Sequence, residues 1–114
     1  MARVVAFIPD LLFGSNVVGA LQAGGHQPAL VSGASELAGA VVDADVLVVD
    51  LTADVEPRLE VMRPLLGGDV RSLGFFSHVE TGVRAAAEEA GFDLVVPRLR
   101  MARAGADLVS QLAG

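Results

Sequence analysis

The sequence predicts an α/β domain, in which one sheet of five parallel strands lies between two layers of helices. Short apolar runs alternate with helical patterns along the whole chain, and no composition break separates a second domain. The chain has 114 residues, 53% of them hydrophobic, which is enough for one buried core. Helices that join successive strands require parallel pairing, so we expect one domain over 1–114 with strand order 2-1-3-4-5.

Each predicted element has a local signal. Strands are expected where the chain is almost continuously apolar, and helices where apolar residues recur at helical spacing between a capping residue and glycine. The predicted strands are 3–8, 28–31, 46–51, 70–76 and 94–96. The predicted helices begin at Ser15 or Asn16, at Ser35, between Asp54 and Pro57, near 80 and near 101. The runs 3–8 and 46–51 are the most apolar, which places them at the centre of the sheet.

The composition excludes several classes of function. There are 14 acidic residues against 8 basic ones, and the net charge of −6 disfavours binding to nucleic acid or an anionic membrane. All basic residues are arginine, so Schiff-base chemistry on lysine is excluded. The absence of cysteine excludes disulfides and thiolate metal ligands. No apolar run is long enough to cross a membrane and no leader pattern opens the chain, so we expect a cytoplasmic protein.

Polar side chains follow the predicted strands at one edge of the sheet. In a sheet of this order, ligands bind at the carboxyl ends of the strands, where the winding reverses between the first and third strands. Asp10 and Asp50 stand at that point, and Ser77, His78 and Arg98 follow the fourth and fifth strands. These five residues are the candidate binding pocket. Asp10 and Asp50 are the candidate ligands for Mg²⁺, since carboxylates suit that cation.

Each candidate also has a structural interpretation. Asp10 and Asp50 can accept hydrogen bonds from nearby backbone N–H groups, as aspartate does in turns. Ser77 and His78 can cap the following helix. Arg98, together with Arg100 and Arg103, is either a solvated helix start or a docking patch for an acidic partner.

Several short motifs fit one family. Val48-Val49-Asp50 resembles the strand that carries the phosphoacceptor aspartate in the receiver domains of bacterial response regulators, and Asp10 resembles part of their acidic pair. Phe76-Ser77 resembles the strand with the conserved hydroxyl, and Leu94–Pro97 the final strand. The resemblance implies a flavodoxin-like (βα)5 sandwich in a bacterial signalling protein. It also implies a homodimer through the last two helices and the fifth strand.

The sequence departs from the family pattern at two positions that serve phosphoryl transfer. Pro9 stands where the family has a second acidic residue, and Pro97 stands where it has a lysine. Phosphoryl transfer needs positive charge to offset the anionic transition state. We therefore expect a degenerate receiver that has no enzymatic activity and binds other proteins.

A second hypothesis is that the site binds a ligand or catalyses a reaction. The chain could be a small flavodoxin-like ligand-binding protein or enzyme that uses a divalent cation at Asp10 and Asp50. In both hypotheses these carboxylates lie on adjacent strands and repel each other. From the sequence alone we therefore expect Asp50→Asn to stabilise the protein.

Overall fold

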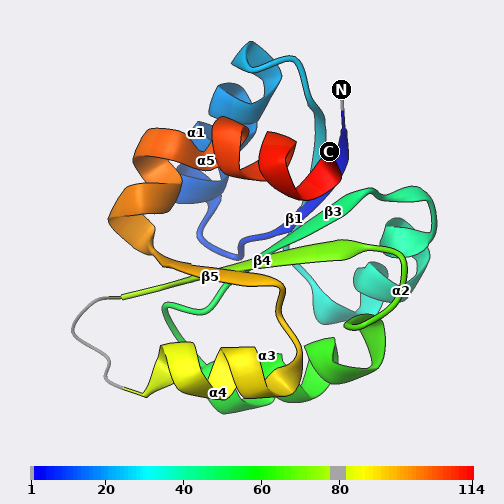
Figure 1. Ribbon diagram of the computed structural model, residues 1–114, viewed down its shortest axis with the longest axis vertical. Helices are drawn as coiled ribbons and strands as arrows, with labels where there is room; N and C mark the ends of the chain where they lie inside the picture. Colours follow the sequence, from blue (N-terminus) through cyan, green and yellow to red (C-terminus); the bar gives the residue numbers. More distant parts are fainter. Residues whose placement is uncertain (1, 78–81) are drawn as a thin grey trace.

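One parallel five-stranded sheet organises the molecule (Figure 1). The computed structural model describes residues 2–77 and 82–114. The strands lie in the order β2-β1-β3-β4-β5, which confirms the predicted α/β fold and topology. Their bounds are β1 Arg3–Phe7, β2 Gln27–Val31, β3 Val46–Asp50, β4 Arg71–Phe76 and β5 Leu94–Pro97.

Helices cover both faces of the sheet. α1 and α5 pack on one face, and α2, α3 and α4 pack on the other (Figure 1). The helices are α1 Leu11–Ala23, α2 Leu37–Ala40, α3 Val55–Met62, α4 Val83–Ala90 and α5 Arg98–Ala113. Three short 3₁₀ turns, η1 Ala34–Glu36, η2 Val41–Asp43 and η3 Arg63–Leu65, flank α2 and extend α3. In the part of the chain that the structure describes, no helix is long and apolar enough to span a membrane.

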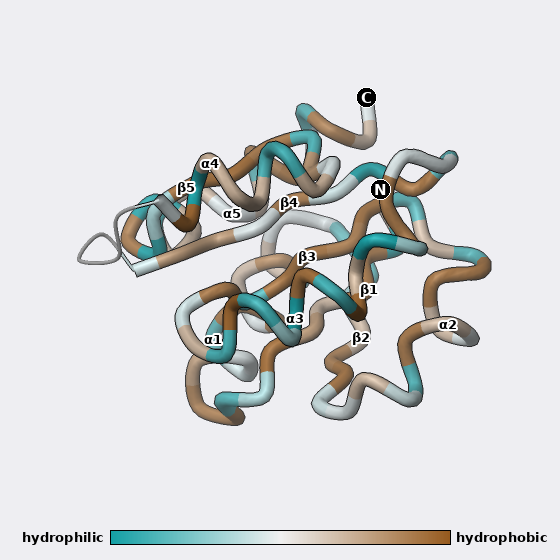
Figure 2. Tube along the Cα trace, turned by 90° about the horizontal axis from the view of Figure 1, so that it is seen from below, coloured by the Kyte–Doolittle hydropathy of each residue, from teal (hydrophilic) through white to brown (hydrophobic). Residues whose placement is uncertain are grey.

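The central strands supply the core to both layers. Successive side chains of a strand point to opposite faces, so the apolar run of β1 divides between the two helix layers. Val5 and Phe7 pack toward α2, α3 and α4, whereas Val4 and Ala6 pack toward α1 and α5. Every residue of β3 is buried. Hydrophobic stretches follow β1 and β3 in Figure 2, and hydrophilic stretches mark the outer turns of the helices.

Two helices begin earlier than predicted. α1 begins at Leu11 rather than near Ser15 or Asn16, because Asp10 caps it: the Asp10 carboxylate accepts a hydrogen bond from the Phe13 amide at 3.0 Å. α5 begins at Arg98 rather than near 101, directly after β5. In both helices the first turn exposes leucines, so the apolar periodicity of the sequence does not mark the true start.

Candidate functional site

The carboxyl ends of β1 and β3 lie side by side at the centre of the sheet. The two strands pair in parallel, with Phe7 opposite Val49. Asp50 is the last residue of β3 and is only 4% exposed. A carboxylate buried to this extent needs partners, because leaving an ionised group without them in a poorly solvated place is costly.

Thr52 supplies the first set of partners for Asp50. Its backbone N–H donates to Asp50 Oδ1 at 2.8 Å, and its hydroxyl donates to the same oxygen at 2.5 Å. This is the local turn that aspartate forms with the residue two positions ahead. The turn holds the Asp50 side chain in one orientation at the end of β3.

Arg58 supplies the positive charge. Its Nη1 donates to the Asp50 backbone carbonyl at 2.8 Å and lies 3.6 Å from Asp50 Oδ1. The guanidinium carbon lies 5.8 Å from the centroid of the Phe7 ring, within the range of a cation–π contact. The Arg58 side chain is only 13% exposed. The guanidinium is therefore an integral part of this site rather than a solvated surface charge.

The turn before α3 directs Arg58 back to β3. Asp54 has φ +49°, a left-handed conformation that aspartate tolerates better than most residues. α3 starts immediately afterwards, and the Arg58 amide donates to the Asp54 carbonyl at 3.0 Å. Arg58 Nη2 also lies 3.7 Å from Asp54 Oδ2. Two aspartates therefore hold this guanidinium, one buried and one exposed.

Asp10 has a different role. It is exposed, and one of its carboxylate oxygens caps α1. Asp10 and Asp50 therefore both accept a hydrogen bond from a nearby backbone N–H, as the structural interpretation of these residues expected. Asp50 also has Arg58 beside it, so relief of repulsion does not govern the effect of removing its charge. We reverse the expectation for Asp50→Asn: the substitution destabilises the protein.

The residues at this edge are a poor ligand set for Mg²⁺. That cation requires near-ideal octahedral oxygen coordination, usually with one or two carboxylates and several waters. Here the buried carboxylate already has a guanidinium beside it. Pro9, next to Asp10, offers no side-chain ligand. Among the described residues, no three histidine, aspartate or glutamate side chains gather as a metal-binding group.

The remaining candidates gather on the side of α1 and α5. Ser77 and Arg98 line a hollow of about 360 Å³ together with Phe13, Leu99 and Ala102. The guanidinium carbon of Arg98 lies 4.2 Å from the centroid of the Phe13 ring. Arg98 therefore stacks on an aromatic ring of α1. His78 lies outside the described residues.

Comparison with known proteins identifies the fold. No family model and no curated protein matches the chain. Among solved structures, a response regulator receiver protein from Burkholderia phymatum is 21% identical, with a TM-score of 0.85 over 100% of this chain and 96% of that one. A response regulator from Thermotoga maritima is 15% identical, with a TM-score of 0.84 over 97% and 96%.

A third solved structure has a different assigned role. A putative pilus assembly-related protein from Burkholderia pseudomallei is 18% identical, with a TM-score of 0.83 over 99% of this chain and 90% of that one. At these identities the likeness is one of fold. The chain has the receiver fold, as the resemblance in its motifs implied.

Arg58 is the functional residue that sequence reasoning missed. It stands eight residues after Asp50 and four after Asp54, the spacing at which helix side chains of opposite charge meet. Because a helix that follows a strand starts at the carboxyl end of the sheet, its first turns lie near the predicted pocket. This spacing, together with the position of Arg58 early in the helix after the third strand, was the sequence signal that could have identified Arg58.

We predict that Arg58 and Asp50 are energetically coupled. Arg58→Met should lower the free energy of unfolding by about 2 kcal/mol, because it leaves a buried carboxylate without its cation. Asp50→Asn should cost about 1 kcal/mol, because an amide oxygen can still accept from Thr52. The double variant should lose less than the sum of the two, which urea unfolding measures.

The matched control is Arg63→Met. Arg63 is exposed on η3 and pairs with the exposed Glu60 at 3.6 Å and the exposed Glu89 at 3.2 Å. Each exposed pair of this kind contributes about 0.5 kcal/mol or less. Additive losses in the Asp50 and Arg58 variants, or equal losses in Arg58→Met and Arg63→Met, would contradict the coupling.

Proposed function

We propose that this chain is a pseudo-receiver: a signalling module with the receiver fold that performs no phosphoryl chemistry and acts by binding other proteins. The observation that carries the proposal is the Arg58 guanidinium on Asp50, the residue that the motif resemblance places at the phosphoacceptor position. The cytoplasm, expected from the sequence pattern, is the compartment we propose for it.

The positive charge beside Asp50 supports a role without phosphoryl transfer. A carboxylate that accepts a phosphoryl group needs a cation that can bridge it to the incoming phosphate. Arg58 Nη1 already donates to the Asp50 carbonyl, and Nη2 lies 3.7 Å from Asp54 Oδ2. A guanidinium also cannot lose its charge or take the place of a hexacoordinate metal ion.

The two prolines support the same conclusion. Pro9 precedes the cap of α1 and adds no charge, and Pro97 ends β5 at the position of the family's lysine. Arg98 follows Pro97 but stacks on Phe13, on the side of α1 and α5. No lysine elsewhere in the chain can supply the missing ammonium.

The structural neighbours include a protein with this kind of regulation. One similar structure is described as an atypical orphan response regulator with a phosphorylation-independent regulatory mechanism; it is 14% identical, with a TM-score of 0.79. The receiver fold therefore accommodates signalling without a phosphoryl group. We apply the same principle to this chain.

We predict that acetyl phosphate with Mg²⁺ leaves the protein unmodified. The reasons are that the Arg58 guanidinium already lies beside Asp50 and that the sequence contains no lysine. Intact-mass spectrometry should give the same profile before and after incubation, and the same profile for Asp50→Asn. A phosphoryl adduct on the wild-type chain that Asp50→Asn lacks would overturn the proposal. It would favour the alternative, an enzyme or ligand-binding protein that uses a divalent cation at Asp10 and Asp50.

We also propose that the chain forms a homodimer through α4, β5 and α5. β5 is an edge strand, and Pro97 at its end lacks a backbone donor. Exposed charges of both signs, Arg84 and Glu88 on α4 and Asp107 on α5, can pair across a two-fold axis.

The dimer is tested by sedimentation velocity. At high micromolar concentration we predict the mass of a dimer, and Arg84→Glu should shift the population to monomer because like charges then face each other. Monomer throughout the wild-type concentration series would contradict the dimer but leave the pseudo-receiver proposal in place.

A further inference from the structure

Another hollow opens at the carboxyl edge of the sheet, on the side that α3 covers. This α3 hollow has a volume of about 370 Å³ and lies between the end of β1, η1 and the first turns of α3. Asp54 and Arg58 are its polar lining residues in the described part of the chain. The rest of its wall is apolar and consists of Phe7, Pro9, Ala34, Pro57 and Val61.

The apolar wall is rigid and open to solvent. Val61 is 38% exposed and is one of the five exposed large hydrophobic side chains among the described residues. Ala34 and Pro57 are exposed as well, and Pro9 is half-buried. The two prolines have a fixed backbone φ, so this part of the wall loses little conformational freedom when a partner binds. The wall is therefore a preformed place for an apolar side chain.

Exposed carboxylates lie on both sides of the hollow. On the α3 side, the Asp54 side chain is 76% exposed, and the exposed Glu56 and Glu60 each directly precede a residue of the apolar wall. On the η1 side, the exposed Glu36 stands two residues after Ala34. Glu36 and Glu56 form no ion pair with a described residue. Their negative charge is therefore available to a partner.

Two arginines near the hollow already have acidic partners. Arg58 lies beside Asp50, and its side chain is only 13% exposed. Arg63, two residues after Val61, lies within 3.6 Å of two exposed glutamates. The edge of the hollow therefore keeps an excess of negative charge, which attracts cationic groups and repels anionic ones.

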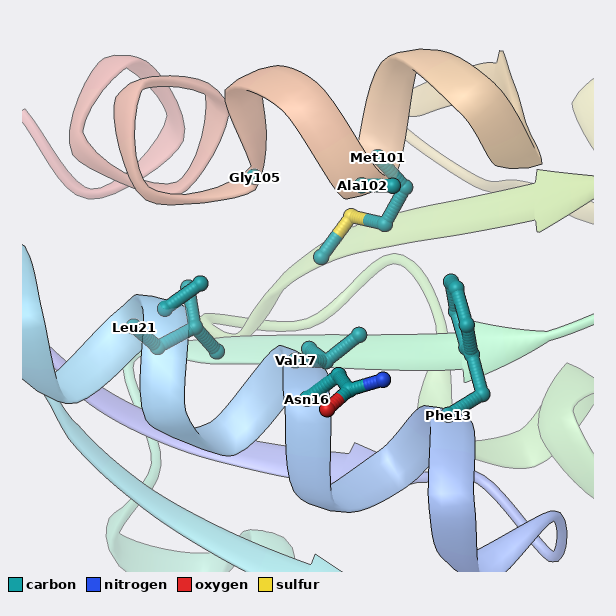
Figure 3. A pocket seen from close by; sticks show the side chains of 8 residues that line it. Phe13, Asn16, Val17, Leu21, Met101, Ala102 and Gly105 are labelled. Atoms are coloured by element: carbon teal, nitrogen blue, oxygen red, sulfur yellow. The ribbon is translucent and has the colours of Figure 1, made fainter.

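The opposite face of the sheet has the opposite charge. Figure 3 shows the hollow of about 100 Å³ between α1 and α5, where Val17 and Leu21 face Met101, and no charged side chain lines it. The first two turns of α5 carry three arginines and no acidic residue. A basic segment is therefore repelled from that face and attracted to the α3 hollow.

We infer that the α3 hollow binds a basic segment of another protein, with one apolar side chain inside the hollow and arginine or lysine side chains on either side of it. The apolar side chain contacts Pro57 and Val61, where burial removes apolar surface from water. The flanking cations pair with Glu36 and Glu56. This inference rests on the proposed function, since it names the partner that a signalling module without phosphoryl chemistry binds.

Other occupants fit the hollow less well. An anionic ligand that approaches Arg58 meets the charges of Asp54 and Glu36. A second copy of the chain offers the exposed run 98–100, in which a leucine stands between two arginines. Each copy, however, has a net charge of −6, so two copies repel each other as whole molecules. A separate basic protein has no such repulsion.

The test uses synthetic peptides with one terminal tryptophan, because the protein contains neither tryptophan nor tyrosine. The first peptide has a central leucine with arginines on both sides. The second has glutamate in place of every arginine, and the third has alanine in place of the leucine. We expect the first peptide to bind the full chain, the second to bind at least about tenfold more weakly, and the third about fivefold more weakly.

Variants locate the binding surface. Glu36→Lys and Glu56→Lys should each weaken binding of the first peptide about fivefold or more, and Val61→Ala about threefold. Asp43→Lys is the matched control for charge, because Asp43 is exposed on η2, before β3, whereas the hollow lies beyond the other end of that strand. It should leave binding unchanged. All four positions are exposed, so the variants should fold, which circular dichroism verifies.

Several results would overturn the inference. These are no binding of the first peptide, equal binding of any two of the three peptides that include the first, or equal losses in Glu56→Lys and Asp43→Lys. Self-association of the free chain that Glu56→Lys and Arg98→Glu each abolish would make the occupant a second copy. Each of these leaves the acetyl phosphate result unaffected, so failure here is distinguishable from failure of the proposed function.

Discussion

The ion pair between Arg58 and Asp50 is the interaction on which the rest of the site depends. A carboxylate at the end of the central strand β3 is almost fully buried, and the guanidinium beside it is the cation that permits this. The same guanidinium binds the carbonyl of β3 and the exposed Asp54, and lies over Phe7 of β1. One side chain of α3 thus ties a helix to two strands of the sheet.

The two faces of the sheet carry different groups. At the carboxyl edge of the sheet, Arg58 of α3 supplies the positive charge beside the buried Asp50 carboxylate, on the side of the sheet that α3 covers. The exposed leucines and the arginines Arg98, Arg100 and Arg103 lie at the other face, on α1 and α5. The pseudo-receiver that we propose retains the fold without using its phosphoryl chemistry.

The fold could be predicted from the sequence because its signals are local. The apolar runs of β1 and β3, the glycines that end α1 and α4, and the alternation of elements together define the sheet order. The start of α1 was missed because Leu11 and Leu12 are exposed, so apolar periodicity begins only at Gly14 and Val17.

The candidate site could be predicted only in part. Asp50 was found because strand ends in a parallel sheet meet at one edge. Arg58 was not found: its spacing from Asp54 and Asp50 indicates only that they can lie near one another, and the inward direction depends on the left-handed turn at Asp54. The burial of Asp50 depends on its tertiary contact with Arg58. Whether Asp50→Asn raises or lowers the free energy of unfolding therefore depends on that contact as well.

The most direct test of the central claim uses Mn²⁺ as a paramagnetic stand-in for Mg²⁺. In amide NMR spectra of the wild-type chain, we predict that low-millimolar Mn²⁺ leaves the signals of Leu51 and Thr52 unbroadened, because Arg58 supplies the charge at Asp50. In Arg58→Ala the same signals should broaden as the metal approaches the uncovered carboxylate. Selective broadening of these signals in the wild type, to the same degree as in the variant, would contradict the account.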